Sequence, residues 1–414
     1  MSGAILVGRT ALLAKIEGSY DTMPSMTGTA DALLIDNCSY DPDFKVIERK
    51  FYRPNLSPNP QRPGRKLAKI KFDIEMAGNG VFATPTRWGR LLRACGMLET
   101  NRGLAFASSV LPVGMASTPL VSWATNGTLT PTDPILYVIT VTTGGASGTA
   151  RCSVTPNDPA LDTAQTNVAM TSGSPVTIGS KGLTATPTWT GNLAIGQTWL
   201  VNLSPGCIEY TPRSSGHESI SLQLFFDGAL HQITGAFGNV SFRANAGEPG
   251  IMTFEFTGRH VPYSDAALPS VAYESQPLPP IFENARLSLN GIQPVVSNFS
   301  FDAGTVMAER SSANRTDGLL GMRITDRNPR LGITPEAQLA ASGNLWAMAE
   351  QGAIVPFTGR IGNAYGNRIN LWTPCSQVTA LPYQESNGIR THNMSLMLSS
   401  LSATGDDEFY LQVG

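Results

Sequence analysis

Residues 218–258 read ESISLQLFFDGALHQITGAFGNVSFRANAGEPGIMTFEFTG and carry the clearest secondary-structure signal in the chain. Apolar residues alternate with polar ones at the start of the stretch, at Ile220, Leu222, Leu224 and Phe226, as in a strand with one buried face. Asp227-Gly228 then supplies the left-handed backbone that a tight hairpin needs. Two further runs, 239–243 and 251–256, read as strands, so the stretch predicts a β-meander of a sandwich or barrel. We find no catalytic group arranged on it.

The composition favours a β protein that buries much of its surface in an assembly. The 414 residues are enough for two or three domains. Forty-one glycines and 29 prolines favour many short strands over long helices. Charged residues make up 14% of the chain, against roughly a quarter in ordinary soluble domains, which indicates burial in an oligomer. A net charge of −2 gives no support to nucleic-acid binding.

The most unusual charge feature lies between Phe44 and Phe72. Nine basic residues are opposed there by Glu48 alone, and they are Lys45, Arg49, Lys50, Arg53, Arg62, Arg65, Lys66, Lys69 and Lys71. The rest of the chain has 20 basic and 30 acidic residues, a net charge of −10. Four prolines in the middle of the segment exclude a central strand, so a long loop is predicted between strands at 45–51 and 66–76.

This basic hairpin has three possible roles. It could be a solvated surface feature, or it could reach onto an acidic neighbouring subunit or ring. A polyanion contact is the weakest possibility, because few aromatic residues are interleaved with the bases. If it makes an inter-ring or inter-subunit contact, the residues expected to make it are Lys45, Arg49, Lys50, Arg53, Arg62, Arg65 and Lys66.

A short helix is predicted over 84–96. Thr84 can cap it, Pro85 suits its first turn, and Gly96 suits the left-handed position after its last turn. Its apolar residues recur at helical spacing and should face a sheet, namely Trp88, Leu91, Leu92 and Cys95.

Residues 124–205 differ from their surroundings. Charged residues almost vanish, and Thr, Gly and Val dominate five strand candidates at 135–141, 149–154, 175–178, 183–189 and 197–203. About eighty residues suit a small β-sandwich. Because the more charged style returns at 208–210, we expect this sandwich to be an insertion.

The second half of the chain repeats the plan of the first, strand–loop–strand–helix–meander. Glu48-Arg49 and Thr84-Pro85 have counterparts in Glu309-Arg310 and Thr334-Pro335, the latter opening a helical run to Gly352. Four pairs match at a constant shift of 138: Ile233 with Leu371, Val240 with Val378, Gly250 with Gly388, and Ile251 with Ile389. We therefore predict a duplication, in which case a ring of three chains could imitate a ring of six.

Patterns that carry chemistry are weak. The four histidines, His217, His231, His260 and His392, lack the spacing of metal ligands, and the five cysteines form no CxxC pair. The acidic cluster at 405–408 reads as a solvated turn or as a partner for the basic hairpin. We therefore expect no enzyme activity, and no catalytic, cofactor or metal site.

The sequence also gives no sign of a membrane protein. No window approaches about 20 apolar residues, so we expect no transmembrane span. The start of the chain lacks a charged region followed by a cleavable apolar core, which leads us to expect synthesis in the cytoplasm.

Three motifs follow one another in a familiar order. They are IKFDIEM at 70–76 with the helix before Gly96, DGALH…GAFGNVSF at 227–242, and Gly388-Ile…MSLML with DDEFYL near the end. In this order they resemble the major tail protein, or tail tube protein, of long non-contractile-tailed bacteriophages. The resemblance implies two tandem β-sandwich or barrel units, each with one short helix, and an inserted immunoglobulin-like domain. The boundaries would be 1–123 and 206–276 for the first unit, 124–205 for the insertion, and 277–414 for the second unit.

The resemblance also implies a function. The chain would be a structural virion protein that polymerises as stacked rings, each of three chains with pseudo-sixfold symmetry, into the tail tube used for DNA ejection. Its partners would be itself, the tape measure, tail terminator and distal tail proteins, and DNA that passes without specific binding; it would be assembled in the host cytoplasm and end in the virion tail. The alternative is a surface carbohydrate-binding or adhesin-like protein, in which Trp123, Trp189 and Trp199 could stack on sugars.

Overall fold

The computed structural model describes residues 5–49, 51–52, 54–55, 57, 59–113, 121–275, 277–315, 318–341, 343–402 and 404–414. This part of the chain contains 29 strands and two helices of six residues each, which confirms the mainly-β prediction. Neither helix is long and apolar enough to cross a membrane.

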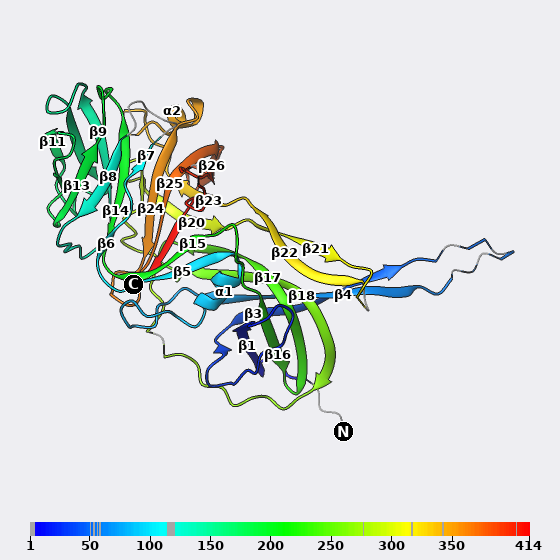
Figure 1. Cartoon of the computed structure of the whole chain (residues 1–414). Coiled ribbons are helices and arrows are strands. Elements are labelled where there is room, and N and C mark those ends of the chain that lie inside the picture. The colour runs from blue at the N-terminus through cyan, green and yellow to red at the C-terminus, as the bar shows by residue number, and fades with distance from the viewer. Residues whose placement is uncertain are drawn as a thin grey trace.

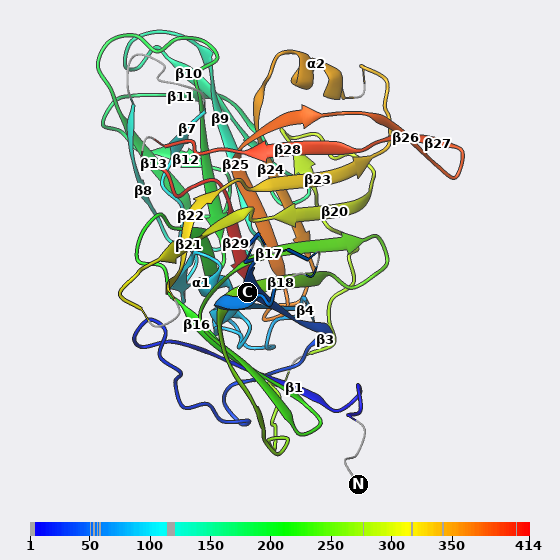
Figure 2. The ribbon, with the colours of Figure 1, turned by 90° about the vertical axis from the view of Figure 1, so that its right-hand side faces the viewer.

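Eight strands, each hydrogen-bonded to the next, form the central array of the molecule. In spatial order they are β25 (Ile369–Ala380), β28 (Met394–Leu398), β23 (Arg330–Pro335), β20 (Val296–Asp302), β17 (Ala229–Asn245), β18 (Ile251–Asp265), β4 (Arg62–Glu75) and β3 (Asp36–Ile47). All the pairings are antiparallel. Figure 2 shows β28, β23, β20, β17 and β18 stacked from top to bottom. The array therefore joins strands of both halves of the chain in one sheet.

The predicted meander forms the centre of this sheet. Strand β16 (Ile220–Phe226) turns through Asp227 and Gly228, both with positive φ, into β17. Strands β17 and β18 are longer than expected, because bulges in their pairing accommodate the glycine-rich segment around Gly235, whose φ is +57°. Strands β1 (Thr10–Ile16) and β2 (Ala32–Leu33) extend the sheet beyond β16.

A second group of strands closes the core from the other side. It comprises β5 (Met97–Arg102), β15 (Cys207–Pro212), β29 (Tyr410–Val413), β24 (Ile354–Ile361) and β19 (Ser288–Leu289). Strand β15 pairs with both β5 and β29 and so ties the C-terminal strand to the first half. One buried apolar cluster runs from Leu12 to Val413, so the predicted boundary at residue 277 does not separate two cores.

Both helices are shorter than the sequence indicates. Helix α1 (Gly89–Ala94) begins after Trp88 without a side-chain cap, so the prediction that Thr84 caps it is wrong; the Thr84 hydroxyl donates to the Phe82 carbonyl instead. The inward face was predicted correctly, since Trp88, Leu91, Leu92 and Cys95 are all buried, and Gly96 ends the helix with φ +88°.

The second helix differs more from its prediction. Strand β23 continues to Pro335, and α2 (Leu345–Glu350) begins only after Asn344, whose side chain accepts from the Ala347 N–H at 2.9 Å. Proline at 335 ends a strand here rather than opening a helix.

Residues 106–113 and 121–204 form a separate two-sheet sandwich, called the inserted sandwich below. One sheet contains β6 (Phe106–Ala107), β7 (Leu111–Pro112), β9 (Ile135–Thr143), β10 (Arg151–Pro156), β11 (Gln165–Ala169) and β14 (Thr198–Ser204). The other contains β8 (Ser122–Asn126), β12 (Val176–Ile178) and β13 (Leu183–Thr188). The sandwich has its own apolar core, and through β6 and β7 it takes in residues before the predicted boundary at 124.

Three hairpins leave the body. The one formed by β3 and β4 is called hairpin 1; it extends far beyond the rest of the molecule (Figure 1). Hairpin 2 consists of β21 (Thr305–Ser311) and β22 (Leu319–Arg327), and Figure 1 shows it running in the same direction. The third, β26 (Tyr383–Ser386) with β27 (Ile389–His392), continues from β25.

Candidate functional site: assembly surfaces

The central array repeats itself. Its first block is β17–β18–β4–β3 and its second block is β25–β28–β23–β20. A row of directly paired residues crosses the first block through Asn239, Glu255, Lys71 and Ser39. The corresponding row of the second block passes through Gln377, Met397, Arg330 and Asp302. Strand order and register therefore recur between the blocks.

The strand register agrees with some of the four sequence matches at a shift of 138 and not with others. Val240 pairs with Phe254, and Val378 pairs with Leu396, so these two valines hold the same place in their blocks. Gly388 differs, because it lies in the turn between β26 and β27 with φ +79°, whereas Gly250 lies directly before β18 without a positive φ. The two blocks thus correspond in strand order and register, whereas the Gly250–Gly388 match does not fall at corresponding positions.

The two blocks are joined edge to edge inside the chain. Residues 241–245 of β17 pair with residues 298–302 of β20. On the core side of this joint, the Phe242 ring stacks on Phe301 with 4.7 Å between centroids and lies 5.7 Å from Phe299. All three rings are at most 3% exposed. Ladder hydrogen bonds and aromatic burial together make this joint a continuous part of the fold.

The outer strands of the array have free edges. Among the described strands, β3 pairs with β4 alone, and β26 pairs with β27 alone. Beyond Gln377, the edge of β25 that carries β24 has no further partner in the described residues. Free edges with unpaired backbone groups are templates for further strands.

Apolar side chains flank both free edges. Beside the β25 edge, Tyr383 is 52% exposed and lies 5.6 Å from the ring of Trp346, itself 42% exposed. At the start of β3, Leu34 is 59% exposed, while Cys38 is half-buried against the core. These side chains are poorly covered compared with the aromatic rings of the internal joint.

Hairpin 1 carries the predicted basic residues. Lys45, Arg49, Arg62 and Lys66 are exposed, whereas Lys50 and Arg53 lie outside the described residues. Arg49 sits over the Phe51 ring at 5.0 Å. Arg65 differs from the others, because its guanidinium contacts Asp43 at 3.3 Å and Glu309 at 2.5 Å within the same chain. The basic surface available to a neighbour is therefore smaller than the sequence suggests.

Sequence reasoning missed that hairpin 1 also exposes apolar side chains. The strands and turn present Phe44, Val46, Ile47, Phe51 and Tyr52, each at least 40% exposed. The sequence signal for them is the presence of five large apolar residues within the basic segment 44–53. A projecting hairpin with this composition is typical of a contact with another protein surface.

Hairpin 2 is packed against the first block, whereas hairpin 1 is exposed. Its apolar residues Leu319, Met322 and Ile324 are buried against Leu67 and Phe237 of the first block. The phenolic oxygen of Tyr20 accepts from the Met322 N–H at 2.7 Å, and Arg259 donates to the Leu319 carbonyl at 2.6 Å. The two hairpins thus share a position in the repeat but differ in their partners.

The face of the array away from the core is polar and of mixed charge. By alternation along the strands, its charged residues are of both signs and include Asp41, Asp73, Glu75, Glu255, Asp302, Lys69, Lys71, Arg243 and Arg330. Several are paired with neighbours; Lys69 lies 3.2 Å from Glu255, and the Thr253 hydroxyl donates to Asp73 at 2.6 Å. Such a face has no dense basic stripe to hold a phosphate backbone.

The inserted sandwich, although it interrupts the first half, docks on the second half. Trp372 of β25 is buried against Leu136 and Leu200 of the sandwich. Asp133 accepts from Arg360 at 2.5 Å and from Arg368 at 2.8 Å. Because these contacts are buried and charged, the sandwich is held in one orientation on the body.

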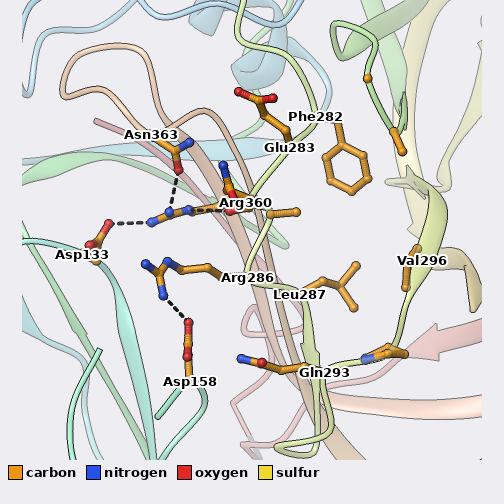
Figure 3. A pocket seen from close by; sticks show the side chains of 15 residues that line it. Asp133, Asp158, Phe282, Glu283, Arg286, Leu287, Gln293, Val296, Arg360 and Asn363 are labelled. Carbon is orange, nitrogen blue, oxygen red and sulfur yellow. Dashed lines mark hydrogen bonds and ion pairs between the residues drawn. The ribbon is translucent and has the colours of Figure 1, made fainter. Parts of the chain in front are cut away.

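A cleft of about 890 Å³ lies beside these contacts (Figure 3). Arg286 points across it to Asp158, and Arg360 lies between Asp133 and Asn363, whose side-chain oxygen accepts at 2.6 Å. Burial, together with the nearby charges of Arg286 and Arg368, lowers the pKa of Arg360, while Asp133 opposes this shift. The charged groups at this cleft hold the sandwich to the body.

The histidines and the acidic cluster are involved in structural contacts. His260 hydrogen-bonds the Tyr40 hydroxyl at 2.6 Å, and the His231 ring lies 4.3 Å from the same ring, tilted by 31°; burial lowers the pKa of both imidazoles. Asp406 contacts Arg327 at 2.5 Å, and although burial opposes it, hydrogen bonds from Ser214 and Arg327 lower the pKa of that carboxyl. The cluster at 405–408 is therefore engaged by Arg327 rather than by hairpin 1.

The tryptophans of the inserted sandwich offer little surface to a sugar. Trp189 and Trp199 are 6% and 2% exposed, and Trp123 packs against Trp199 with 5.4 Å between ring centroids. Trp189 and Trp199 are buried in the sandwich core, whereas Trp123 is half-buried, so two of the three rings proposed to stack on sugars are covered.

Within the described ranges, no group of three histidine, cysteine, aspartate or glutamate side chains is placed to hold a metal ion. No model of a known protein family matches the sequence, and a comparison with curated proteins finds no significant match.

Proposed function

We propose that this chain is a structural subunit that assembles with copies of itself into rings, and that the rings stack into a tube. The observation that carries the proposal is the edge-to-edge joint of the two array blocks, together with the free edges at both ends of the array. A sheet that already joins two equivalent blocks within the chain is suited to add a third from another copy.

The tube we propose is the tail tube of a long-tailed phage, and the virion tail is the corresponding location. In that setting the tape measure, tail terminator and distal tail proteins are further proposed partners. The inserted sandwich would project from the outside of the tube, held by Asp133, Asp158 and their arginine partners.

The polar face of the array is the proposed channel wall. Its balanced charges would let DNA pass without binding it tightly, since the phosphate backbone is held by closely spaced basic groups. This role is structural rather than enzymatic.

Negative-stain electron microscopy of the purified full chain tests the proposal. We expect rings or tubes of uniform bore, and no retardation of duplex DNA by the assembled protein at physiological salt. A chain that stays monomeric at all concentrations, or that forms aggregates without a bore, would overturn it. Specific binding in a glycan screen, with no ring or tube, would favour the adhesin-like alternative.

A further inference from the structure

The internal joint between β17 and β20 offers a template for a contact between chains. The inference rests on the proposed assembly and names the surfaces that make it. In the joint, Ser241 of β17 lies directly opposite Asp302 of β20. The residues equivalent to Ser241 and Asp302 at the free ends of the array can be identified from the strand pairing.

The rows of paired residues identify the equivalent of Asp302. Asp302 is the last residue of the row Gln377–Met397–Arg330–Asp302, and Ser39 is the last residue of the equivalent row in the first block. Ser39 therefore stands at the free β3 edge where Asp302 stands at the joined β20 edge.

The partner position follows from the row two steps further on. Ser241 pairs with Thr253 two rows beyond the Asn239–Glu255 pair, and Ala380 pairs with Ser395 two rows beyond the Gln377–Met397 pair. A bulge between Val378 and Ala380 adds one residue to β25, so Ala380 is the equivalent of Ser241. Ala380 is exposed and Ser39 is half-exposed in the chain by itself.

We infer that β3 of one copy pairs antiparallel with the end of β25 and with β26 of a second copy, with Ser39 opposite Ala380. This is a head-to-tail contact between two different surfaces, so it propagates around a ring until the ring closes. Two strand edges that lack partners in the described chain then gain ladder hydrogen bonds, as β17 and β20 do within it.

Side chains next to the edges support a second copy as the occupant. In the internal joint, Phe242 and Phe301 bury their rings on the core side. By the same register, Leu381 and Cys38 take these places between chains, with exposed Tyr383 and Leu34 beside them. Pairing with another copy would cover the exposed side chains of Tyr383 and Leu34.

Cysteine cross-linking tests the contact in the full chain. Directly opposed residues of an antiparallel pair have Cα atoms about 4.5–5.5 Å apart, within reach of a disulfide. The test variant carries Ser39→Cys and Ala380→Cys, in a Cys38→Ala background that removes the neighbouring native thiol. The matched control carries Ser241→Cys and Asp302→Cys, the equivalent pair inside one chain.

After mild oxidation of the assembled protein, we expect the test variant to give covalent dimers and trimers on a denaturing gel without reductant. The control pair should give a cross-linked monomer, and each single variant should give no ladder. Rings or tubes that form while the test pair stays monomeric, with the control cross-linked, would overturn the inference and leave the proposed function intact. A wild-type chain that forms no ring or tube would overturn both.

Discussion

Hairpins 1 and 2 hold equivalent places in the two halves of the array but have opposite environments. Hairpin 2 buries Leu319 and Met322 on the first block and is tied there by Tyr20. Hairpin 1 projects into solvent and leaves apolar side chains such as Phe44 and Val46 exposed. Hairpin 2 therefore has its partner in the same chain, whereas the partner proposed for hairpin 1 is a neighbouring copy.

The proposed contact between chains indicates which surface of the neighbouring copy hairpin 1 would cover. Hairpin 2 leaves from β20 and packs over β17, to which β20 is joined, and over the next strand, β18. If β3 joins β25 of the next copy, hairpin 1 leaves the corresponding edge and would lie over that copy. The exposed basic and apolar residues of hairpin 1 would then be the residues that contact the neighbouring copy.

Shortening hairpin 1 should have the largest effect. Ile47 and Arg62 are directly paired, so residues 48–61 can be replaced by Asn-Gly to give a tight two-residue turn. We expect a folded chain, with a melting temperature within about 2 °C of wild type because surface changes cost little, that no longer forms rings or tubes by electron microscopy.

The matched control shortens hairpin 2, where Ser311 pairs with Leu319, by replacing residues 312–318 in the same way. Assembly should persist in that variant. Normal tubes from the shortened hairpin 1, or loss of tubes from the shortened hairpin 2 alone, would contradict the difference between the hairpins.

Truncating one apolar side chain in each hairpin should give the next largest effect, measured as a loss in the free energy of unfolding. Leu319 is fully buried, so Leu319→Ala should lower the free energy of unfolding by about 2–4 kcal/mol. Val46 is 52% exposed, and Val46→Ala should cost about 0.5 kcal/mol or less. Urea unfolding of both variants, in the chain with the shortened hairpin 1, measures this. Equal losses would show that hairpin 1 is packed within its own chain.

The ion pair between the hairpins should give the smallest effect. Arg65 of hairpin 1 and Glu309 of hairpin 2 are 22% and 28% exposed, so solvent screens their attraction. A double-mutant cycle with Arg65→Met and Glu309→Gln should give a coupling of about 1 kcal/mol or less in urea unfolding. The more exposed pair Lys69–Glu255 is the control, with a smaller coupling expected. A larger value for the control pair would mean that Arg65 does not link the hairpins in solution.

The sequence predicted the elements with strong local signals. The meander at 220–256, the turn at Asp227-Gly228 and the inward face of α1 were all evident from periodicity and turn chemistry. Helix starts were misplaced, because Thr-Pro pairs also suit strand ends and turns; Pro335 terminates β23.

The candidate assembly surface could be predicted only in part. The basic residues of hairpin 1 were visible as a charge run, but the partners of Arg65 and the packing of hairpin 2 depend on contacts distant in sequence. The β17–β20 joint has no local signal either, since its strands alternate as any amphipathic strand does. The docking of Asp133 on Arg360 likewise joins positions more than 200 residues apart.

The symmetry of the assembled ring tests the central claim most directly. Each chain contributes two array blocks but a single inserted sandwich, so class averages from electron microscopy of end-on rings should show a wall with six similar segments and three outer projections. Six projections on such a wall, or rings without this twofold relation between segments and projections, would contradict the claim that the two blocks are equivalent units of one assembly.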